Sequence, residues 1–130
     1  MPYNPQHNGV AERMNRTILN MVCSMMFFKN VKLMFWANAV LCVVYVKNRY
    51  PYNSIRNTIP YEMWYEHIPL VKHLNVFGST YYALISKEQT SKLDARSHTC
   101  IFLGYSNTSN AYVSMINLIR SFCIQRCVFS

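Results

Sequence analysis

The sequence predicts an α+β fold in which two long helices come first and a small β-barrel follows. Apolar residues recur at helical spacing from Gly9 to Tyr50, and from Leu74 onward the period of the apolar positions changes to two. The stretch between them is rich in Pro, Asn, Ser and Thr near its start, which is typical of a connection. We therefore expect a helical region, a linker with a short helix, and a β region, over residues 1–50, 51–73 and 74–130.

The first predicted helix runs from Gly9 to about Phe28. Projected at about 100° per residue, its apolar side chains form one stripe, made of Val10, Met14, Ile18, Met21, Val22, Met25 and Phe28. Glu12, Arg16 and Cys23 fall on the opposite side. We expect the Met-rich stripe to pack in a core and not to hold a cofactor. Its natural partner would be a sheet that this chain does not contain.

The second predicted helix runs from about Lys32 to Tyr50 and is apolar on nearly all sides, which predicts burial against the first helix and a further element. Pro51 closes it, because the residue before a proline is pushed out of the helical region. A short helix is expected to begin at Pro60, since proline is well tolerated at a first helical position. It should end before Pro69.

The β region is predicted to contain five short strands. They are separated by Gly, Asn and Ser residues and by a Lys/Glu/Ser segment. The expected strands are 76–77, 80–85, 99–103, 111–116 and 122–129. Five short strands in so compact a tail indicate a small barrel.

The composition favours a polyanionic partner. Thirteen Lys and Arg residues against five Asp and Glu give a formal net charge of +8. Such an excess is typical of proteins that bind nucleic acid, although a basic globule without such a partner has the same composition. The candidate cations are Arg13, Arg16, Lys29, Lys32, Arg49 and the lysines of the β region. The longest apolar stretch, Leu33 to Val46, is shorter than the roughly 20 residues that cross a bilayer. We therefore expect a buried helix there and no membrane partner.

The five cysteines indicate a reducing compartment. Their number is odd, they show no CxxC pairing, and the polar, Pro-rich start of the chain does not resemble a secretory signal peptide. The expected location is the nucleus or the cytoplasm, and not a secreted state. Cys123 and Cys127 would share a face of a strand and could lie near Cys100 or His98. Such a group has the side chains that a zinc site would need. We favour the interpretation that they are small apolar core residues.

An ordered series of motifs resembles the integrase of Copia-type LTR retrotransposons. Residues 1–16 form a turn-prone Pro/Asn/Gly segment that leads into a helix with Glu12 in its first turn, similar to the last catalytic segment of these enzymes. Further similar segments follow in the same order and spacing over nearly the whole chain. They are Phe35-Trp-Ala-Asn-Ala-Val40 with Tyr45 and Asn48-Arg49, Thr58-Ile-Pro-Tyr-Glu-Met-Trp64, Leu74-Asn-Val-Phe-Gly78, Lys92-Leu-Asp94 and Cys100-Ile-Phe-Leu-Gly-Tyr105.

The resemblance implies a fold, a chemistry and a set of site residues. The helices would be the C-terminal part of a ribonuclease H-like integrase core, here incomplete, and the β region an SH3-like barrel. Such integrases hold Mg²⁺ or Mn²⁺ with two aspartates and a glutamate and join retroelement ends to target DNA. Glu12 would be the catalytic, metal-binding glutamate. The DNA-binding positions would be Gln6, Asn8, Asn15 and Arg16, and integrase self-association would be a further contact.

The chain departs from this pattern at the aspartates. Asp94 is its one Asp, and it lies downstream of Glu12 in a different context. The sequence therefore reads as the back end of an integrase, without its first two catalytic acids. We expect it to be inactive alone and to hold no metal by itself. For Glu12 the alternative is a first-turn glutamate that the helix dipole favours, and for its polar neighbours a solvated helix face.

Three functions follow from these patterns. The chain is a segment of an integrase, or a non-catalytic module that binds nucleic acid or integrase subunits, or a non-functional transposon relic. The choice between the last two depends on whether the helices can bury their apolar faces without the missing sheet.

Overall fold

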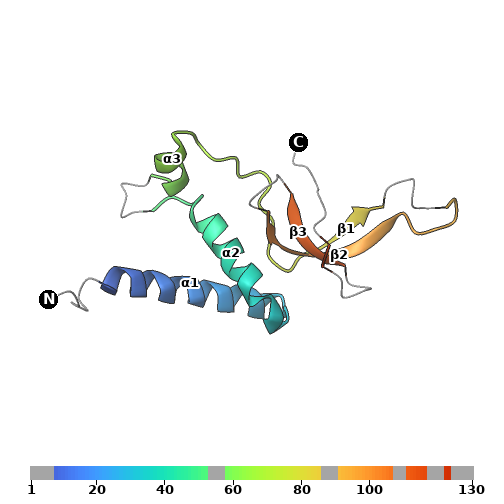
Figure 1. Cartoon of the computed structure of the whole chain (residues 1–130), viewed down its shortest axis with the longest axis horizontal. Helices are drawn as coiled ribbons and strands as arrows, with labels where there is room; N and C mark the ends of the chain where they lie inside the picture. Colours follow the sequence, from blue (N-terminus) through green and yellow to red (C-terminus); the bar gives the residue numbers. More distant parts are fainter. Residues whose placement is uncertain (1–7, 53–57, 86–90, 107–110, 117–121, 124–130) are drawn as a thin grey trace.

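The computed structural model describes residues 8–52, 58–85, 91–106, 111–116 and 122–123. The described chain is a mixed fold in which helices come first and a small antiparallel sheet follows, as the change of period predicts (Figure 1). The helices are α1 (Gly9–Phe28), α2 (Trp36–Lys47) and α3 (Pro60–Tyr65), with a 3-10 turn η2 (Leu33–Phe35) before α2. The strands are β1 (Thr80–Leu84), β2 (Ser97–Tyr105), β3 (Tyr112–Ile116) and β4 (Phe122–Cys123).

The turn between α1 and α2 is short and well defined. Asn30 adopts a left-handed conformation with a φ of 49°, which Asn tolerates better than most residues. The N–H of Val31 then donates to the carbonyl oxygen of Met26 over 3.0 Å, so the end of α1 is capped. Lys32 is extended, with a ψ of 140°, and α2 therefore begins at Trp36 and not at Lys32 as predicted.

The end of α2 is also earlier than predicted. Its last residue is Lys47, and Asn48 to Tyr50 continue as a turn whose N–H groups still donate to carbonyls of the last helical turn. The short helix α3 begins at Pro60 as predicted, and Glu66 ends it in a left-handed conformation with a φ of 59°. No helix among the described residues is both long and apolar enough to cross a membrane.

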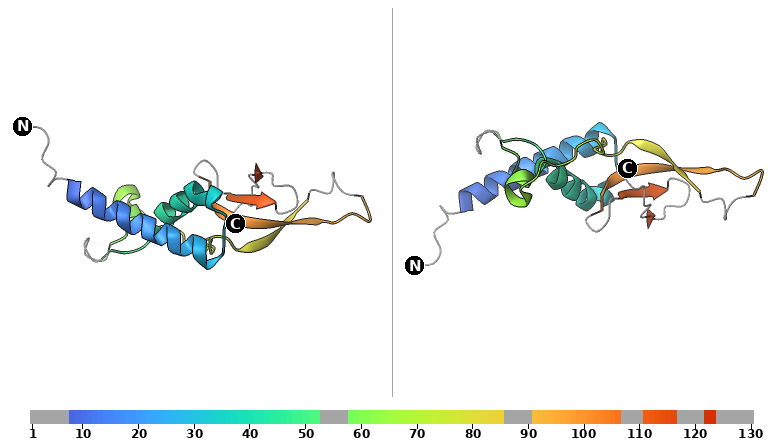
Figure 2. Two further views of the ribbon diagram at one scale, coloured as in Figure 1. Left: turned by 90° about the horizontal axis from the view of Figure 1, so that it is seen from below. Right: turned by 90° about the horizontal axis from the view of Figure 1, so that it is seen from above.

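α2 lies between α1 and the sheet. It contacts α1 and β2, and Figure 1 shows it turning back obliquely from the end of α1 and running toward α3. The N-terminal half of α1 extends away from both (Figure 2). The further element that the apolar surface of α2 predicts is therefore the sheet of the same chain, but the burial is partial, since Trp36, Leu41 and Val44 are exposed.

Burial along α1 differs from the predicted stripe. Val22 and Met26 are the buried residues of this helix, although Met26 does not belong to the stripe. Ile18 and Met25 are partly buried against the core. The other four stripe residues are exposed: Val10, Met14, Met21 and Phe28. The prediction that the whole stripe packs is thus wrong: Val10 and Met14 lie in turns of α1 that the core does not reach, and Met21 and Phe28 are exposed beside the turns that it covers.

The sheet is an antiparallel meander with the strand order β1-β2-β3-β4. β1 pairs with β2 in the register Tyr81↔Cys100, and β2 pairs with β3 in the register Ile101↔Met115. A bulge between Phe102 and Gly104 interrupts the second ladder, and Gly104 has a φ of 142°, which L-residues with a side chain rarely adopt. Within the described residues β1 and β4 are the two edges, so the sheet is open there and not a closed barrel.

Four of the five predicted strands are present at least in part, in the ranges that the structure describes. The strand predicted over residues 76–77 is wrong, because this segment forms a turn in which the N–H of Ser79 donates to the carbonyl oxygen of Val76 over 3.1 Å. The left-handed φ of 76° at Gly78 directs the chain into that turn. Of the last predicted strand, residues 124–129 lie outside the described residues.

One hydrophobic core joins the helices to the sheet. Its fully buried side chains include Cys42 and Val43 from α2, Phe77 from the turn before β1, and Phe102 and Leu103 from β2. These side chains come from segments that are far apart in the sequence, and the burial of their apolar surface favours the packing of the helices on the sheet. The helical and β parts of the described chain therefore share a core.

Candidate nucleic-acid interface

The start of α1 carries the residues that the sequence singles out. Asn8 is the N-cap of α1, and its side chain forms no capping hydrogen bond. Glu12 lies in the first turn, and Asn15 and Arg16 follow at the helical spacing that places them on a neighbouring part of the same surface. All four side chains are exposed, whereas Gln6 lies outside the described residues. The structure thus brings the described candidates together on one free end of a helix.

Glu12 alone does not fit the metal site that the resemblance implies. Within the described residues, no three His, Cys, Asp or Glu side chains lie close enough to hold a metal ion together. Mg²⁺ requires an almost octahedral set of oxygen ligands and otherwise keeps its water. One exposed carboxylate cannot position two ions, although its place near the positive end of the helix dipole favours its charge.

Two lysines next to α1, Lys47 at the end of α2 and Lys29 just after α1, contact aromatic rings or sulfur. The Lys47 ammonium lies 3.1 Å from the Met14 sulfur and 5.0 Å from the centre of the Tyr52 ring. Lys29 lies over the Phe28 ring at 5.4 Å. Ring and thioether contacts orient a cation without supplying an opposite formal charge.

A ladder of rings and a guanidinium connects the sheet to α3. Tyr105 of β2 stacks on Tyr45 of α2, with ring centres 4.2 Å apart. The guanidinium carbon of Arg49 lies 3.4 Å from the centre of the Tyr45 ring and 4.6 Å from that of Tyr61, and Tyr61 in turn contacts Tyr65 at 4.5 Å. The planar guanidinium can face two rings at once, which an ammonium cannot. Arg49 is thus a structural link between α2 and α3, and its charge is partly covered.

His73 joins the linker to the same ladder. Its Nε2 and the Tyr45 hydroxyl share a hydrogen bond of 2.8 Å, and its carbonyl oxygen accepts a hydrogen bond of 2.9 Å from the Tyr112 hydroxyl. Burial, and then the nearby charge of Arg49, lower the pKa of His73. The imidazole therefore stays neutral at a pH where an exposed histidine begins to protonate.

The buried thiol of Cys42 and the buried hydroxyl of Tyr105 are inert in acid–base terms. Burial raises the pKa of each to about 12. A thiol with so high a pKa is neither a nucleophile nor a metal ligand at neutral pH. Cys42 and the fully buried Cys100 are core residues, as predicted, whereas Cys23 is exposed. The side chains of Cys123 and Cys127 are outside the described part of the chain, so the zinc alternative stays a prediction.

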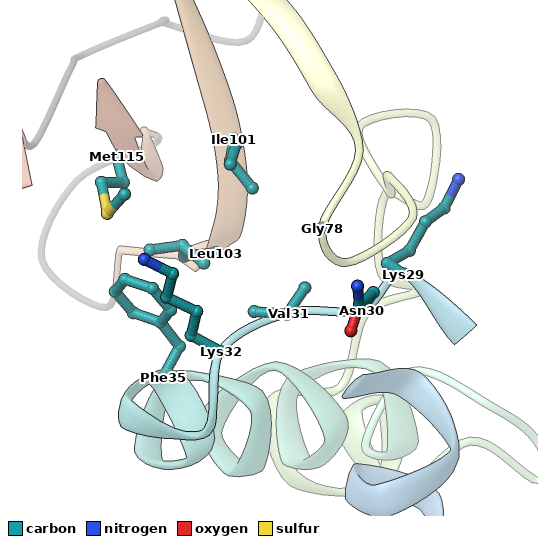
Figure 3. A pocket seen from close by; sticks show the side chains of 9 residues that line it. All are labelled: Lys29, Asn30, Val31, Lys32, Phe35, Gly78, Ile101, Leu103 and Met115. Atoms are coloured by element: carbon teal, nitrogen blue, oxygen red, sulfur yellow. The ribbon is translucent and has the colours of Figure 1, made fainter. Parts of the chain in front are cut away.

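A second basic feature lies where the α1–α2 turn meets the sheet. Here a pocket of about 150 Å³ is lined by apolar side chains from the turn, from η2 and from strands β2 and β3 (Figure 3). Lys29 and Lys32 flank it, and the Asn30 amide stands between them. From the sequence alone, both lysines are only general candidates for binding nucleic acid. The pocket itself depends on residues about 70 positions downstream, and no local pattern reveals that pairing.

Comparisons with known proteins agree with the resemblance. Residues 79–128 match the family described as the retroviral polymerase SH3-like domain. Over 112 residues the chain is 43% identical to the retrovirus-related Pol polyprotein from transposon TNT 1-94 of Nicotiana tabacum, which covers 86% of this chain and 8% of that polyprotein. It is also 32% identical, over 114 residues, to the Pol polyproteins from transposons RE1 and RE2 of Arabidopsis thaliana.

The extent of these matches defines what the family assignment covers. The alignments with RE1 and RE2 include 88% of this chain and 8% of each polyprotein, so the chain corresponds to a short stretch of these relatives. No solved structure matches it significantly. The chain therefore belongs with the Pol polyproteins of Copia-type retrotransposons, and its β part belongs to the retroviral polymerase SH3-like domain family.

Proposed function

We propose that this chain is the C-terminal end of an integrase catalytic core joined to an SH3-like domain, and that it binds nucleic acid without catalysing integration by itself. In this proposal the helices derive from a ribonuclease H-like core, and Glu12 corresponds to its catalytic glutamate. Retroelement ends and target DNA are the proposed partners. In a complete site, Mg²⁺ or Mn²⁺ would supply the charge that stabilises phosphoryl transfer.

The observation that carries the proposal is the exposed start of α1. Glu12, Asn15 and Arg16 project from a helix end that the described core leaves uncovered. The relatives whose sequence this chain shares are Pol polyproteins of retrotransposons. An acid on a rigid, accessible helix end suits a site completed by other acids, and an arginine one turn later suits a phosphate.

The charge of the chain supports binding that does not depend on sequence. A protein with a net charge of +8 gains affinity for DNA mainly by releasing condensed counterions. The exposed Arg13 and Arg16 of α1 suit phosphates, whose positions carry no sequence information. We therefore propose that unrelated duplexes of equal length bind equally, and that the affinity falls steeply as salt rises.

A salt series on such duplexes tests the proposal. The logarithm of the affinity should fall linearly against the logarithm of the salt concentration, with a slope of several units. The double variant Arg13→Ala with Arg16→Ala should lower that slope by about two units, because two phosphate contacts are lost. Asn20→Ala, an exposed polar change on the same helix, is the matched control and should leave the slope unchanged. A folded wild-type sample that binds no duplex at low salt would refute the proposal.

Catalysis is tested separately. With either Mg²⁺ or Mn²⁺, the isolated chain should neither process retroelement ends nor join them to target DNA, because it supplies one of the three acids. Strand transfer that disappears in Glu12→Gln would show that the chain completes its site by another route. Binding without strand transfer is the expected pair of results.

The second candidate function is a contact with integrase subunits. The exposed apolar residues of α1, such as Val10 and Met14, favour it, since contiguous exposed apolar surface is typical of protein contacts. Light scattering distinguishes subunit contact from nucleic-acid binding. A protein-binding module would self-associate in high salt, where nucleic-acid binding is lost.

A further inference from the structure

The pocket at the junction of the helices and the sheet has the features of a ligand site. Its floor and walls are Phe35, Ile101, Leu103 and Met115, which come from η2, β2 and β3 (Figure 3). An apolar cavity of about 150 Å³ is known to accept a single aromatic ring, and this pocket has about that volume. A flat, largely apolar group is therefore the size and kind of ligand that fits.

The backbone around the pocket is held in place before any ligand binds. The N–H of Gly78 donates to the carbonyl oxygen of Phe102 over 2.8 Å, and the N–H of Phe102 donates to that of Ser79 over 2.9 Å. A Cβ atom at Gly78 would lie 2.7 Å from both the Lys29 Cβ and a Val31 methyl carbon. The two turns are thus packed closely against each other, and a preformed site costs little ordering on binding.

The polar groups at the mouth are cationic or neutral. Lys32 extends beside Phe35 toward Leu103, while Lys29 lies beyond Gly78 with its ammonium directed away from the pocket, over the Phe28 ring (Figure 3). Asn30 lies in the turn between these two lysines. No carboxylate is among the described residues that line the pocket. An apolar slot with Lys32 at its mouth and a second lysine at its outer side complements a planar group that is linked to negative charge.

We propose that this pocket receives one unpaired nucleobase of a single strand, with the flanking phosphates on Lys29 and Lys32 and the Asn30 amide on the base edge. A base linked to phosphates has the planar body, the polar edge and the negative charge that the site complements. An apolar protein side chain would fill the same space but would supply no negative charge to either lysine. The proposal rests on nucleic-acid binding as proposed above and assigns the strand and the site.

The first test changes only the ligand. Binding of a short single strand with one fluorescent pyrimidine analogue is compared with binding of the same strand carrying an abasic position there. Loss of the base should weaken binding at least about fivefold, the lower range for base stacking, and the analogue should change its fluorescence when bound. Equal affinities for the two strands would overturn the proposal.

The second test changes only the pocket. Lys29→Ala with Lys32→Ala should lower the salt slope for the single strand by about 1.4, as two lost phosphate contacts predict. The matched control, Lys72→Ala with Lys92→Ala, removes the same charge from exposed positions outside the pocket. This control should lower the salt slope for the single strand by less. Equal losses from the two pairs would mean diffuse attraction and would overturn the proposal.

Asn30→Gly isolates the amide. Glycine tolerates the left-handed conformation at this position, so the turn should keep its shape. The variant should reduce the difference between the intact and the abasic strand, and circular dichroism should show an unchanged fold. An unchanged difference would remove the amide from the proposed site.

The outcomes separate this inference from the proposed function. A folded chain that binds neither duplex nor single strand refutes both. Duplex binding with no effect of the abasic position refutes the pocket alone. Self-association that Val31→Glu abolishes would assign the pocket to a protein contact and overturn the nucleobase assignment.

Discussion

The two halves of α1 have the same amphipathic pattern and different surroundings. In the C-terminal half Val22 and Met26 are 4% and 6% exposed, whereas in the N-terminal half Val10 and Met14 are 76% and 43% exposed. The C-terminal half lies against α2 and the shared core, while the N-terminal half extends beyond them (Figure 2). Periodicity therefore predicts which face of a helix can be buried. A neighbouring element then decides which turns of that face become buried.

The difference also bears on function. If the helices could not bury their apolar faces without a further sheet, the chain would be a non-functional transposon relic. The C-terminal half of α1 and most of α2 have a core of their own, which the sheet of the same chain completes. The N-terminal half of α1, where Glu12 and Arg16 lie, is largely exposed, and the Lys47 ammonium 3.1 Å from the Met14 sulfur is a contact that α2 makes with it. This favours a chain that can fold and present a free helix end.

The largest expected effect comes from emptying the shared core. Phe102 is 1% exposed and contacts both Tyr105 and Tyr112 edge to face. Phe102→Ala should lower the free energy of unfolding by about 3–5 kcal/mol, because it removes transfer free energy and leaves a cavity. Urea unfolding followed by circular dichroism measures it. A cost below about 1 kcal/mol would mean that the helices and the sheet do not share a core.

The Arg49 link should have a smaller effect. Arg49→Lys keeps the charge but loses the planar group that faces Tyr45 and Tyr61, and it also loses the hydrogen bond from Nη1 to the Tyr45 carbonyl oxygen. We expect a cost of about 1 kcal/mol in the free energy of unfolding. Near-ultraviolet circular dichroism should report the altered packing of the tyrosines. Full stability in this variant would show that α3 is not held through Arg49.

The pH dependence tests the same region. The pKa of His73 is lowered from the usual 6.5 in the folded state, so the unfolded chain binds a proton that the folded chain resists. Stability contributed by the neutral ring is therefore present above about pH 6.5 and is lost as the pH falls below it. Urea unfolding at about pH 7 and about pH 5.5 should show this loss. In His73→Gln the free energies of unfolding at the two pH values should be more alike. If their difference is the same as in the wild type, other groups cause the loss of stability at low pH.

The smallest effect is expected at the free half of α1. Val10→Ala should change the free energy of unfolding by less than about 0.5 kcal/mol, as exposed substitutions usually do. The same measurement as for Phe102→Ala gives the matched comparison. A cost similar to that of a core substitution would mean that another element covers this half of α1 in solution.

The sequence by itself predicted the order and nature of the elements. The bounds of α1, the start of α3 at Pro60 and the positions of β1, β2 and β3 follow from spacing, proline and the change of period, which are local properties. The motif series also predicted the family that the comparisons confirm. Residues 76–77 were mistaken for a strand because an apolar pair before a glycine has the same local pattern as a strand end.

The tertiary structure alone decided which faces are buried and where a ligand site forms. Met26 is buried, and Met14 is not, because of where α2 and the sheet lie. The ladder from Tyr105 through Arg49 to Tyr61, and the pocket between Lys32 and Met115, each join residues far apart in the chain. The physical reason is that packing is a non-local property: burial and charge placement depend on elements that approach in space, and no spacing within one segment contains that information.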